Sequence, residues 1–333
     1  MYPSTSNAET LIEVSGLKKY FPVTKGFIFR KTIGNVKAVD DVSFRIPKGH
    51  AFGLVGESGS GKTTTGNLVA GLLDSTSGTI KYREEIITKE AARRKGYRKR
   101  FGIVFQDPYS SLDPRMKVVQ SIVEPLNVYN LGSKKERLEK GLKLLEVVGL
   151  PAMAANRYPH QFSGGQRQRI AIARAIALSP ELIIADEPVS ALDVSEQARI
   201  VNLFKDLINE FELSYLFISH DLSIVKTICQ DVAVMYLGKI VEIGTVKDIF
   251  EKAAHPYTIG LLRSIPVPNP ATMRSRKSGA VFGEIPSPLN PPKGCRFNTR
   301  CPYAKDKCRT EEPQIDMITN THGVACHFWN KLS

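Results

Sequence analysis

The sequence contains no apolar run long enough to cross a membrane. A membrane-spanning helix needs about 20 consecutive apolar residues, and the most apolar stretch, residues 170–185, is interrupted by Arg174, Pro180 and Glu181. The first residues also lack a basic segment followed by an apolar core, so no secretory signal is expected. These two absences favour a soluble, intracellular protein.

Cysteine is scarce until the end of the chain. Of the five cysteines, four lie close together: Cys295, Cys301, Cys308 and Cys326. In a chain for which no export is expected, such clustering favours metal binding over disulfide bonds. The fifth, Cys229, lies in an apolar segment with helical spacing, so we expect a small, buried side chain there.

The chain has no excess of acidic residues, since 46 basic residues face 33 acidic ones and the net charge is +13. A basic excess can favour nucleic acid or an anionic membrane surface. Aromatic residues do not alternate with the basic runs, as they would in a groove where bases stack. We therefore expect a solvated basic surface and no nucleic-acid partner.

Short apolar runs alternate with helical patterns along most of the 333 residues. Strands are predicted within residues 11–55 and over 101–105, 182–185 and 215–218, and helices over 62–73, 165–178 and 196–209. This alternation predicts an α/β fold with crossover helices. Residues 113–162 are helical and interrupt the alternation. Past residue 264, seven prolines between 266 and 292 predict an irregular tail.

Residues 56–63 match the phosphate-binding loop pattern G-x-x-x-x-G-K-[ST]. The loop follows the apolar run 50–55 and opens a helical segment, which is the context that the pattern requires. Backbone N–H groups of such a loop converge on phosphate oxygens. Lys62 is expected at the β- and γ-phosphates, and the Thr63 hydroxyl at Mg²⁺. The predicted nucleotide-binding residues here are Gly56, Glu57, Ser58, Gly59, Ser60, Gly61, Lys62, Thr63 and Thr64.

Two further motifs carry chemistry. The apolar run 182–185 ends in Asp186 and Glu187, which can hold the Mg²⁺ shell and polarise an attacking water, respectively. Ser163, Gly164, Gly165 and Gln166 stand at the start of a predicted helix. A capping serine at a helix start makes a second anion-binding N-terminus, which can serve the γ-phosphate of a nucleotide held by another molecule.

These motifs, in this order, resemble the ATP-binding-cassette (ABC) ATPases over about residues 10–250. The resemblance implies a RecA-like P-loop domain over residues 10–264, with an antiparallel β subdomain and an α-helical subdomain at about 113–165. In that family, the sequence of residues 163–166 is the signature loop that meets ATP across a head-to-tail dimer.

The same resemblance assigns further residues. Gln106 resembles the Q-loop glutamine, a contact to Mg²⁺ and water, and His220 resembles the switch histidine that contacts the γ-phosphate. The D-loop residues are Ser190, Ala191, Leu192 and Asp193. Tyr20 is the candidate aromatic for stacking on adenine, with Phe21 or Phe29 as alternatives and simple packing on the sheet as another.

The four tail cysteines lack the closely spaced pairs typical of structural zinc sites. Four thiolates on looser loops suit an iron–sulfur cluster better, with zinc or unliganded thiols as alternatives and His322 or His327 as substitute ligands. Residues 255–262, 283–288, 291–297 and 300–302 resemble the ATPase subunits of oligopeptide/dipeptide permeases, and more the second of their two paired ATPases. Some members of that group carry a [4Fe-4S] cluster on the matching cysteines, and the resemblance therefore implies one in the extension 265–333.

The function that the resemblance implies is ATP hydrolysis that drives a binding-protein-dependent importer, with di- or oligopeptides as the leading cargo and nickel or glutathione as others. The implied partners are an identical or paralogous ATPase, two transmembrane permease subunits and, indirectly, an extracytoplasmic solute-binding protein. The implied location is the cytoplasmic face of the membrane. The alternative is a soluble ABC ATPase that acts on nucleic acid or ribosomes.

Overall fold

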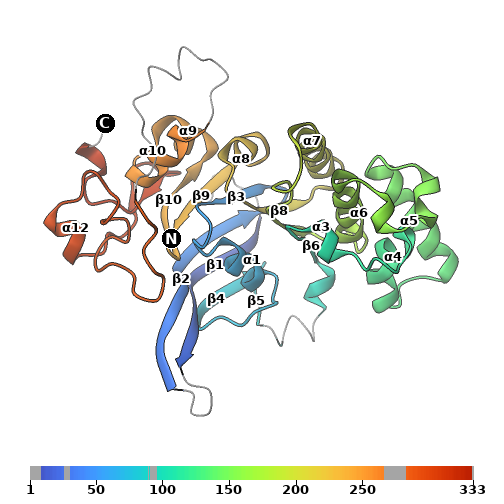
Figure 1. Ribbon diagram of the computed structural model, residues 1–333, viewed down its shortest axis with the longest axis horizontal. Helices are drawn as coiled ribbons and strands as arrows, with labels where there is room; N and C mark the ends of the chain where they lie inside the picture. Colours follow the sequence, from blue (N-terminus) through green and yellow to red (C-terminus); the bar gives the residue numbers. More distant parts are fainter. Residues whose placement is uncertain (1–8, 26–30, 89, 91–95, 266–282, 332–333) are drawn as a thin grey trace. The chain divides into compact units, whose positions relative to one another are not determined.

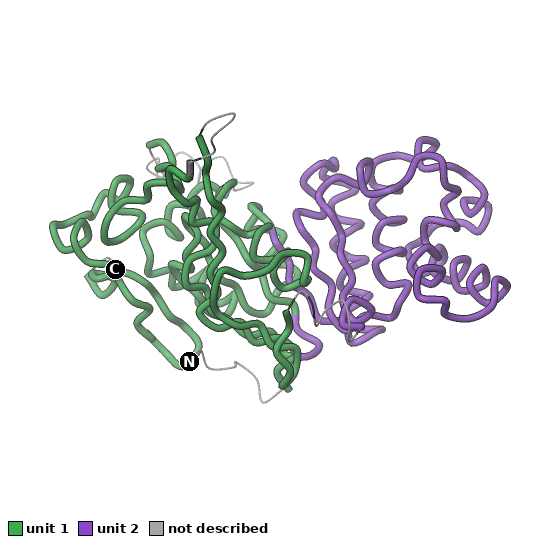
Figure 2. Tube along the Cα trace, turned by 90° about the horizontal axis from the view of Figure 1, so that it is seen from below, with its two compact units in different colours: residues 1–47, 51–89, 219–333 green, residues 48–50, 90–218 purple. Residues whose placement is uncertain are grey.

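The computed structural model describes residues 9–25, 31–88, 90, 96–265 and 283–331 (Figure 1). The chain forms two compact units, which Figure 2 colours green and purple. Unit 1 comprises residues 1–47, 51–89 and 219–333, and unit 2 comprises residues 48–50 and 90–218. Within the described ranges, no helix combines the length and apolar character that a membrane span requires.

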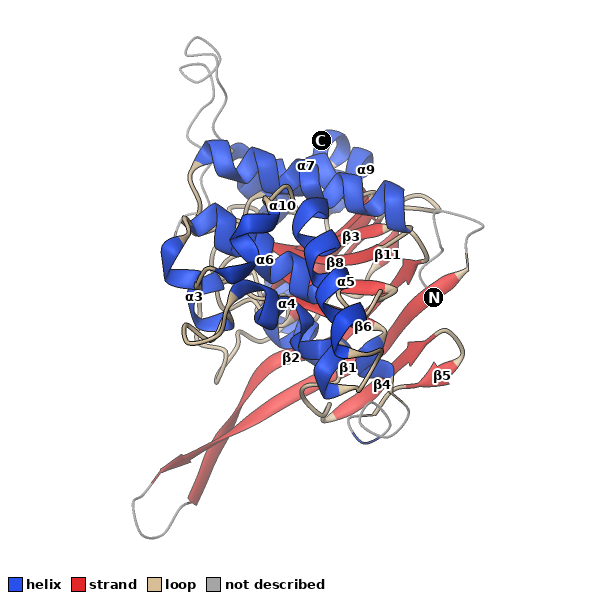
Figure 3. Cartoon of the chain, turned by 90° about the vertical axis from the view of Figure 1, so that its right-hand side faces the viewer, coloured by secondary structure: helices blue, strands red, loops and turns tan. Residues whose placement is uncertain are grey.

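Unit 1 contains an antiparallel sheet of four strands in the order β2-β1-β4-β5. The strands are β1 (Thr10–Lys25), β2 (Lys31–Pro47), β4 (Ser77–Tyr82) and β5 (Glu85–Ile86). β1 and β2 pair along most of their length and continue together as a two-stranded ribbon (Figure 3). At one end of this ribbon, apolar residues such as Val14, Leu17 and Phe44 are buried. Near the other end, Ile33 is 55% exposed.

A second set of strands in unit 1 begins with β3 (Ala51–Val55), which pairs in parallel with β9 (Asp231–Tyr236). β10 (Lys239–Thr245), β12 (Gly323–Val324) and β11 (Asp316–Met317) then follow in antiparallel pairing. Every residue of β3 and β9 is buried, as expected for strands covered on both faces. The predicted irregular tail therefore adds two short strands to the sheet that leads into the phosphate-binding loop.

The helices that the structure describes in unit 1 are short. They are α1 (Lys62–Val69), α8 (Leu222–Ile228), α9 (Val246–Lys252), α10 (Pro256–Arg263), α12 (Asp306–Thr310) and the 3₁₀ turn η4 (Trp329–Lys331). α1 ends before the predicted residue 73, because Gly71 follows it with a left-handed φ of 65°, the usual conformation just past a helix end. Cys229 is buried after α8, as predicted.

Unit 2 contains three parallel strands in the order β6 (Phe101–Val104), β7 (Leu182–Asp186) and β8 (Ser214–Ser219). Its helices and 3₁₀ turns are η1 (Tyr97–Lys99), α3 (Pro108–Ser111), α4 (Val118–Val128), α5 (Lys134–Val147), η2 (Ala152–Asn156), η3 (Pro159–Gln161), α6 (Gly164–Ile176) and α7 (Val194–Phe211). α7 packs on β8, since the Phe204 ring meets Tyr215 and Phe217 edge-on at 5.4 and 5.7 Å between ring centroids. The helical region predicted over residues 113–162 is present as several short elements.

Candidate nucleotide site and cysteine cavity

The phosphate-binding loop connects β3 to α1, as the sequence predicts. Gly61 has a φ of 106°, and a Cβ atom there would lie 2.1 Å from the carbonyl oxygen of Ala38. Only glycine fits such a close approach. No side chain caps the N-terminus of α1, the arrangement in which the backbone N–H groups of a helix start bind phosphate.

Lys62 is the first residue of α1, and its side chain extends back to the start of this loop. The residue is only 4% exposed, and its ammonium group donates hydrogen bonds to the carbonyl oxygens of Gly56 at 2.7 Å and Glu57 at 2.9 Å. Thr63 is exposed and Thr64 half-buried at the start of α1. The loop therefore holds a positive charge where the motif requires one.

Tyr20 lies on β1 and is half-buried. Its hydroxyl donates a hydrogen bond of 2.5 Å to Asp40, and burial together with this carboxylate raises the pKa of Tyr20 to about 12. Although burial opposes ionisation, the bond from Tyr20 and the charges of Lys239 and Arg296 keep the pKa of Asp40 below its ordinary value. The hydroxyl thus has a structural partner, and stacking of the ring on adenine stays a prediction. Phe29 lies outside the described residues.

The structure brings together two residues that were predicted from separate motifs. Gln106 follows β6, Glu187 follows β7, and the Gln106 side-chain amide donates a hydrogen bond of 3.1 Å to the Glu187 carboxylate. Glu187 has a left-handed φ of 47°, and its N–H donates to the carbonyl oxygen of Ile218. Non-glycine residues in this conformation are concentrated at functional sites. Asp186 immediately precedes it as the last residue of β7.

The signature residues form the start of α6. The Ser163 hydroxyl accepts a hydrogen bond from the Gln166 N–H at 3.3 Å, and the Gln166 side chain accepts one from the Ser163 N–H at 3.1 Å. This reciprocal pair is a capping box, which confirms that Ser163 begins the helix. Both residues are exposed, and Phe162 beneath them is buried.

The D-loop connects Glu187 to α7. The Ser190 hydroxyl donates to the carbonyl oxygen of Glu187 at 3.1 Å. Asp193 caps α7 by accepting from the Glu196 N–H at 3.0 Å, and hydrogen bonds from Ser195 and Glu196 lower its pKa. Ala191 and Leu192 lie between these two anchors. In unit 1, the exposed His220 follows β8 and precedes Asp221, which caps α8 by accepting from the Ser223 N–H at 2.8 Å.

The four tail cysteines line one small cavity of unit 1. Its other lining residues include His255, Phe297, Tyr303, His327 and Phe328. Burial, and after it the neighbouring thiols, raise the pKa of Cys295 to about 12 and that of Cys326 to about 11. Across the described ranges, no three His, Cys, Asp or Glu side chains are arranged to hold a metal ion.

Of the two histidines considered as substitute ligands, His327 lines this cavity and His322 is not among its lining residues. His322 is buried and lies 2.8 Å from the carboxylate of Glu242, and the His327 ring lies 3.0 Å from the carbonyl oxygen of Glu311. Sequence reasoning also missed Tyr257, Arg296 and Arg300, which contact the phosphate-binding loop or its neighbours. No spacing rule predicts such long-range contacts.

Comparison with known proteins identifies the family. The ABC transporter family model matches residues 39–190, and the model of the oligopeptide/dipeptide transporter C-terminal region matches residues 241–308. The oligopeptide transport ATP-binding protein AppF of Bacillus subtilis (strain 168) is 49% identical over 98% of this chain and 100% of its own length. The chain belongs to the ABC transporter ATP-binding proteins of the oligopeptide/dipeptide transporter family. It is an ATPase whose hydrolysis is coupled to transport.

Other relatives agree with this assignment. The dipeptide transport ATP-binding protein DppF of Haemophilus influenzae is 48% identical, with 95% of this chain and 96% of that protein covered. Among solved structures, the dimeric post-hydrolysis state of the ATP-binding cassette MJ0796 with ADP and Pi has a TM-score of 0.62 and 26% identity, and covers 71% of this chain and 98% of its own. The predicted ABC ATPase fold is therefore confirmed. Family membership also implies ATP as ligand, a partner ATPase and membrane permeases.

Proposed function

We propose that this chain is the motor subunit of a binding-protein-dependent importer of di- and oligopeptides. The observation that carries the proposal is the similarity to AppF over nearly the whole chain, tail included. The proposed partners are an identical or paralogous ATPase, two transmembrane permease subunits and, indirectly, an extracytoplasmic solute-binding protein. Docking on the permeases would hold the chain at the cytoplasmic face of the membrane.

At the nucleotide, Lys62 is proposed to bind the β- and γ-phosphates, and Thr63, Gln106 and Asp186 to complete the Mg²⁺ shell. Glu187 would polarise the attacking water as a general base, and His220 would contact the γ-phosphate. The hydrogen bond between Gln106 and Glu187 supports this assignment, since a base must be oriented before it can act.

The signature residues 163–166 are proposed to bind the γ-phosphate of ATP held by the partner ATPase, with the D-loop residues 190–193 beside them. The exposed start of α6, with no acidic residue in its first turn, supports this role, because the positive end of a helix dipole stabilises an anion. ATP would then join the two subunits, and its hydrolysis would release them. Closure on ATP and opening after hydrolysis would drive the permease subunits.

Glu187→Gln tests the catalytic assignment. The variant should bind MgATP normally and hydrolyse it about 10²–10⁴-fold more slowly, as is typical when a general base is lost. Phosphate release under single-turnover conditions measures the rate. Glu210→Gln, which changes an exposed residue of α7, is the matched control and should retain full activity. Near-normal turnover in Glu187→Gln would remove the proposed base.

The cargo is tested by reconstituting the chain with its permease subunits and solute-binding protein in vesicles. Di- and oligopeptides should stimulate ATP hydrolysis and accumulate inside, whereas nickel and glutathione should not. Stimulation by nickel or glutathione alone would assign a different cargo to the same motor.

We also propose that Cys295, Cys301, Cys308 and Cys326 hold a [4Fe-4S] cluster. Their convergence on one cavity lined by apolar rings supports the proposal, since Cys₄ ligation is the rule for this cluster. A bound cluster would supply a metal centre that cross-links the tail. Metal binding would also convert the four thiols to thiolates, against the burial that raises the pKa of Cys295, Cys301 and Cys326.

Anaerobic purification tests the cluster. The protein should be brown and contain iron and acid-labile sulfide, and Cys301→Ser and Cys308→Ser should lose most of both. Cys229→Ala is the control, because this cysteine is buried after α8 and is not among the residues that line the cavity. A colourless protein that contains zinc would contradict the iron–sulfur proposal and favour a zinc site.

A further inference from the structure

The tail segment between Cys295 and Cys301 carries two arginines whose side chains are buried. The side chains of Arg296 and Arg300 are 6% and 4% exposed. A buried guanidinium is stable only when it is paired. Both carboxylate partners lie outside the tail. Glu57 is itself a predicted nucleotide-binding residue, and Asp40 accepts a hydrogen bond from another, Tyr20.

Arg300 forms a two-pronged ion pair with Glu57 of the phosphate-binding loop. Its two terminal nitrogens lie 2.6 and 2.9 Å from the two carboxylate oxygens, the strongest geometry for such a pair. The guanidinium also lies 5.7 Å from the ring centroid of Tyr236 and 5.9 Å from that of Phe297. Arg300 is therefore held rigidly against the loop.

Glu57 is held at its backbone as well. Its N–H donates a hydrogen bond of 2.8 Å to the hydroxyl of Tyr257, a fully buried residue of α10. Tyr257 packs against Tyr236 and Phe297, with ring centroids 4.7 and 5.4 Å away. The tail thus reaches the loop through a continuous aromatic cluster and through an ion pair.

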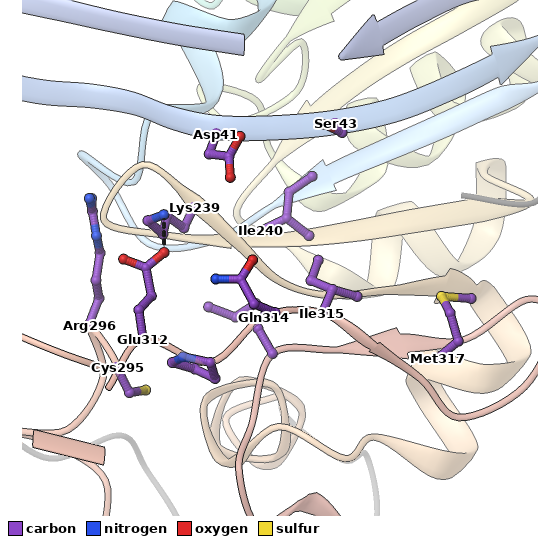
Figure 4. A pocket seen from close by; sticks show the side chains of 13 residues that line it. Asp41, Ser43, Lys239, Ile240, Cys295, Arg296, Glu312, Gln314, Ile315 and Met317 are labelled. Atoms are coloured by element: carbon purple, nitrogen blue, oxygen red, sulfur yellow. Dashed lines mark hydrogen bonds and ion pairs between the residues drawn. The ribbon is translucent and has the colours of Figure 1, made fainter. Parts of the chain in front are cut away.

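Arg296 makes the second link. It donates hydrogen bonds to the carbonyl oxygen of Leu237 and to Asp40, the residue that binds the Tyr20 hydroxyl. Gly238, next to Leu237, donates to the carbonyl oxygen of Ser60 in the phosphate-binding loop at 2.8 Å. Figure 4 shows Arg296 next to Cys295, and the nearby ion pair between Lys239 of β10 and Glu312 of the tail.

A carboxylate in a phosphate-binding loop opposes the binding of a polyanion. We propose that Arg300 is a positioning residue of the ATP site, which neutralises and fixes Glu57 and so couples the cysteine cavity to the ATP affinity of its own subunit. The proposal rests on the proposed ATP-binding role of this loop. Cys301 follows Arg300 directly, and Cys295 precedes Arg296. A movement of Cys295 or Cys301 would therefore act directly on the backbone of the adjacent arginine.

The test measures MgATP affinity of the full chain by calorimetry, in the Glu187→Gln background so that ATP persists. Arg300→Met should weaken binding about tenfold, within the usual range of coupling between sites. Arg300→Lys should lose less affinity, since lysine keeps the positive charge but cannot form the two-pronged ion pair. Arg309→Met, an exposed arginine of α12, is the matched control and should bind as the background does.

A second substitution, which removes the charge of Glu57, distinguishes the loss of charge neutralisation from general damage to the site. Adding Glu57→Gln to Arg300→Met should restore most of the lost affinity, because no unpaired carboxylate then faces the phosphates. Cys301→Ser should also weaken MgATP binding, and adding Arg300→Met to it should cause little further loss, since the two act through one contact.

Three results would overturn the proposal: affinity of folded Arg300→Met equal to that of Arg309→Met, no rescue by Glu57→Gln, or additive losses for Cys301→Ser and Arg300→Met. If Arg300→Met fails to fold, the MgATP affinity of Arg300→Lys is compared with that of Arg309→Met instead. Failure of the background protein itself to bind MgATP would contradict the ATP-binding function instead, so the two failures are distinguishable.

Discussion

Two glycines of the phosphate-binding loop have the same backbone requirement but different surroundings. Gly59 and Gly61 both adopt a positive φ, of 77° and 106°. A Cβ atom at Gly59 would meet nothing within 4 Å, whereas one at Gly61 would overlap the carbonyl oxygen of Ala38. The sequence motif requires glycine at 61 and leaves 59 variable, and this difference in space explains why.

These two positions make a prediction at the scale of single residues. Gly59→Ala should cost about 1 kcal/mol of unfolding free energy, the strain of alanine in a left-handed conformation. Gly61→Ala should cost about 3 kcal/mol, since the overlap with Ala38 adds to that strain. It should also abolish MgATP binding, because the loop must shift. Urea denaturation and calorimetry measure the two effects, and equal behaviour of the two variants would contradict the argument.

At the scale of elements, Glu13 ties three strands together. It lies on β1 and forms ion pairs with Arg45 of β2 at 2.6 Å and with Lys81 of β4 at 3.2 Å. The hydrogen bond from Arg45 lowers the pKa of Glu13 from its ordinary 4.5, with a smaller contribution from Lys81 and against the effect of burial. The stability that this carboxylate contributes is therefore present above pH 4.5 and is lost as the pH falls through the lowered pKa.

Glu13→Gln should consequently destabilise the protein by about 1 kcal/mol at pH 7, in the range of partly exposed ion pairs. The difference from wild type should shrink as the pH falls below 4.5, where the wild-type carboxylate takes up its proton. Urea denaturation across this pH range measures it. A deficit that stays constant at low pH would mean that packing, and not charge, holds the strands.

Local elements were predictable because their causes are local. Ser163 with Gln166 marks the start of α6, and the apolar run before Asp186 marks β7, so both motifs fell at the predicted places. The end of α1 was missed because the sequence pattern continued past Gly71. The contact between Gln106 and Glu187 joins two strands and has no local pattern.

At the scale of the whole molecule, the tail is part of unit 1 rather than an appendage ordered only by its cysteines. Glu242 of β10 is fully buried and accepts hydrogen bonds from the N–H groups of Ala254 and His255 and pairs with His322. Phe297 and Val324 of the tail are also buried. The composition of the tail does not predict its attachment to unit 1, because the attachment depends on contacts between residues that are 80 or more positions apart.

Loss of one tail contact should therefore weaken the fold of unit 1. His322→Ala should cost about 2 kcal/mol of unfolding free energy, because it removes a partner from a buried carboxylate. Arg309→Ala, which changes an exposed residue of α12, is the control and should cost under about 0.5 kcal/mol, as surface substitutions do. Equal losses in urea denaturation would show that the Glu242 contact contributes nothing.

The pairing of β12 with β10 also fixes the order of events during synthesis. Translation produces β10 before residues 322–324, so until these residues are synthesised one edge of β10 is unpaired and Glu242 lacks its His322 partner. We therefore expect a truncated translation product to be recognised by chaperones and proteases before it can compete for permease subunits.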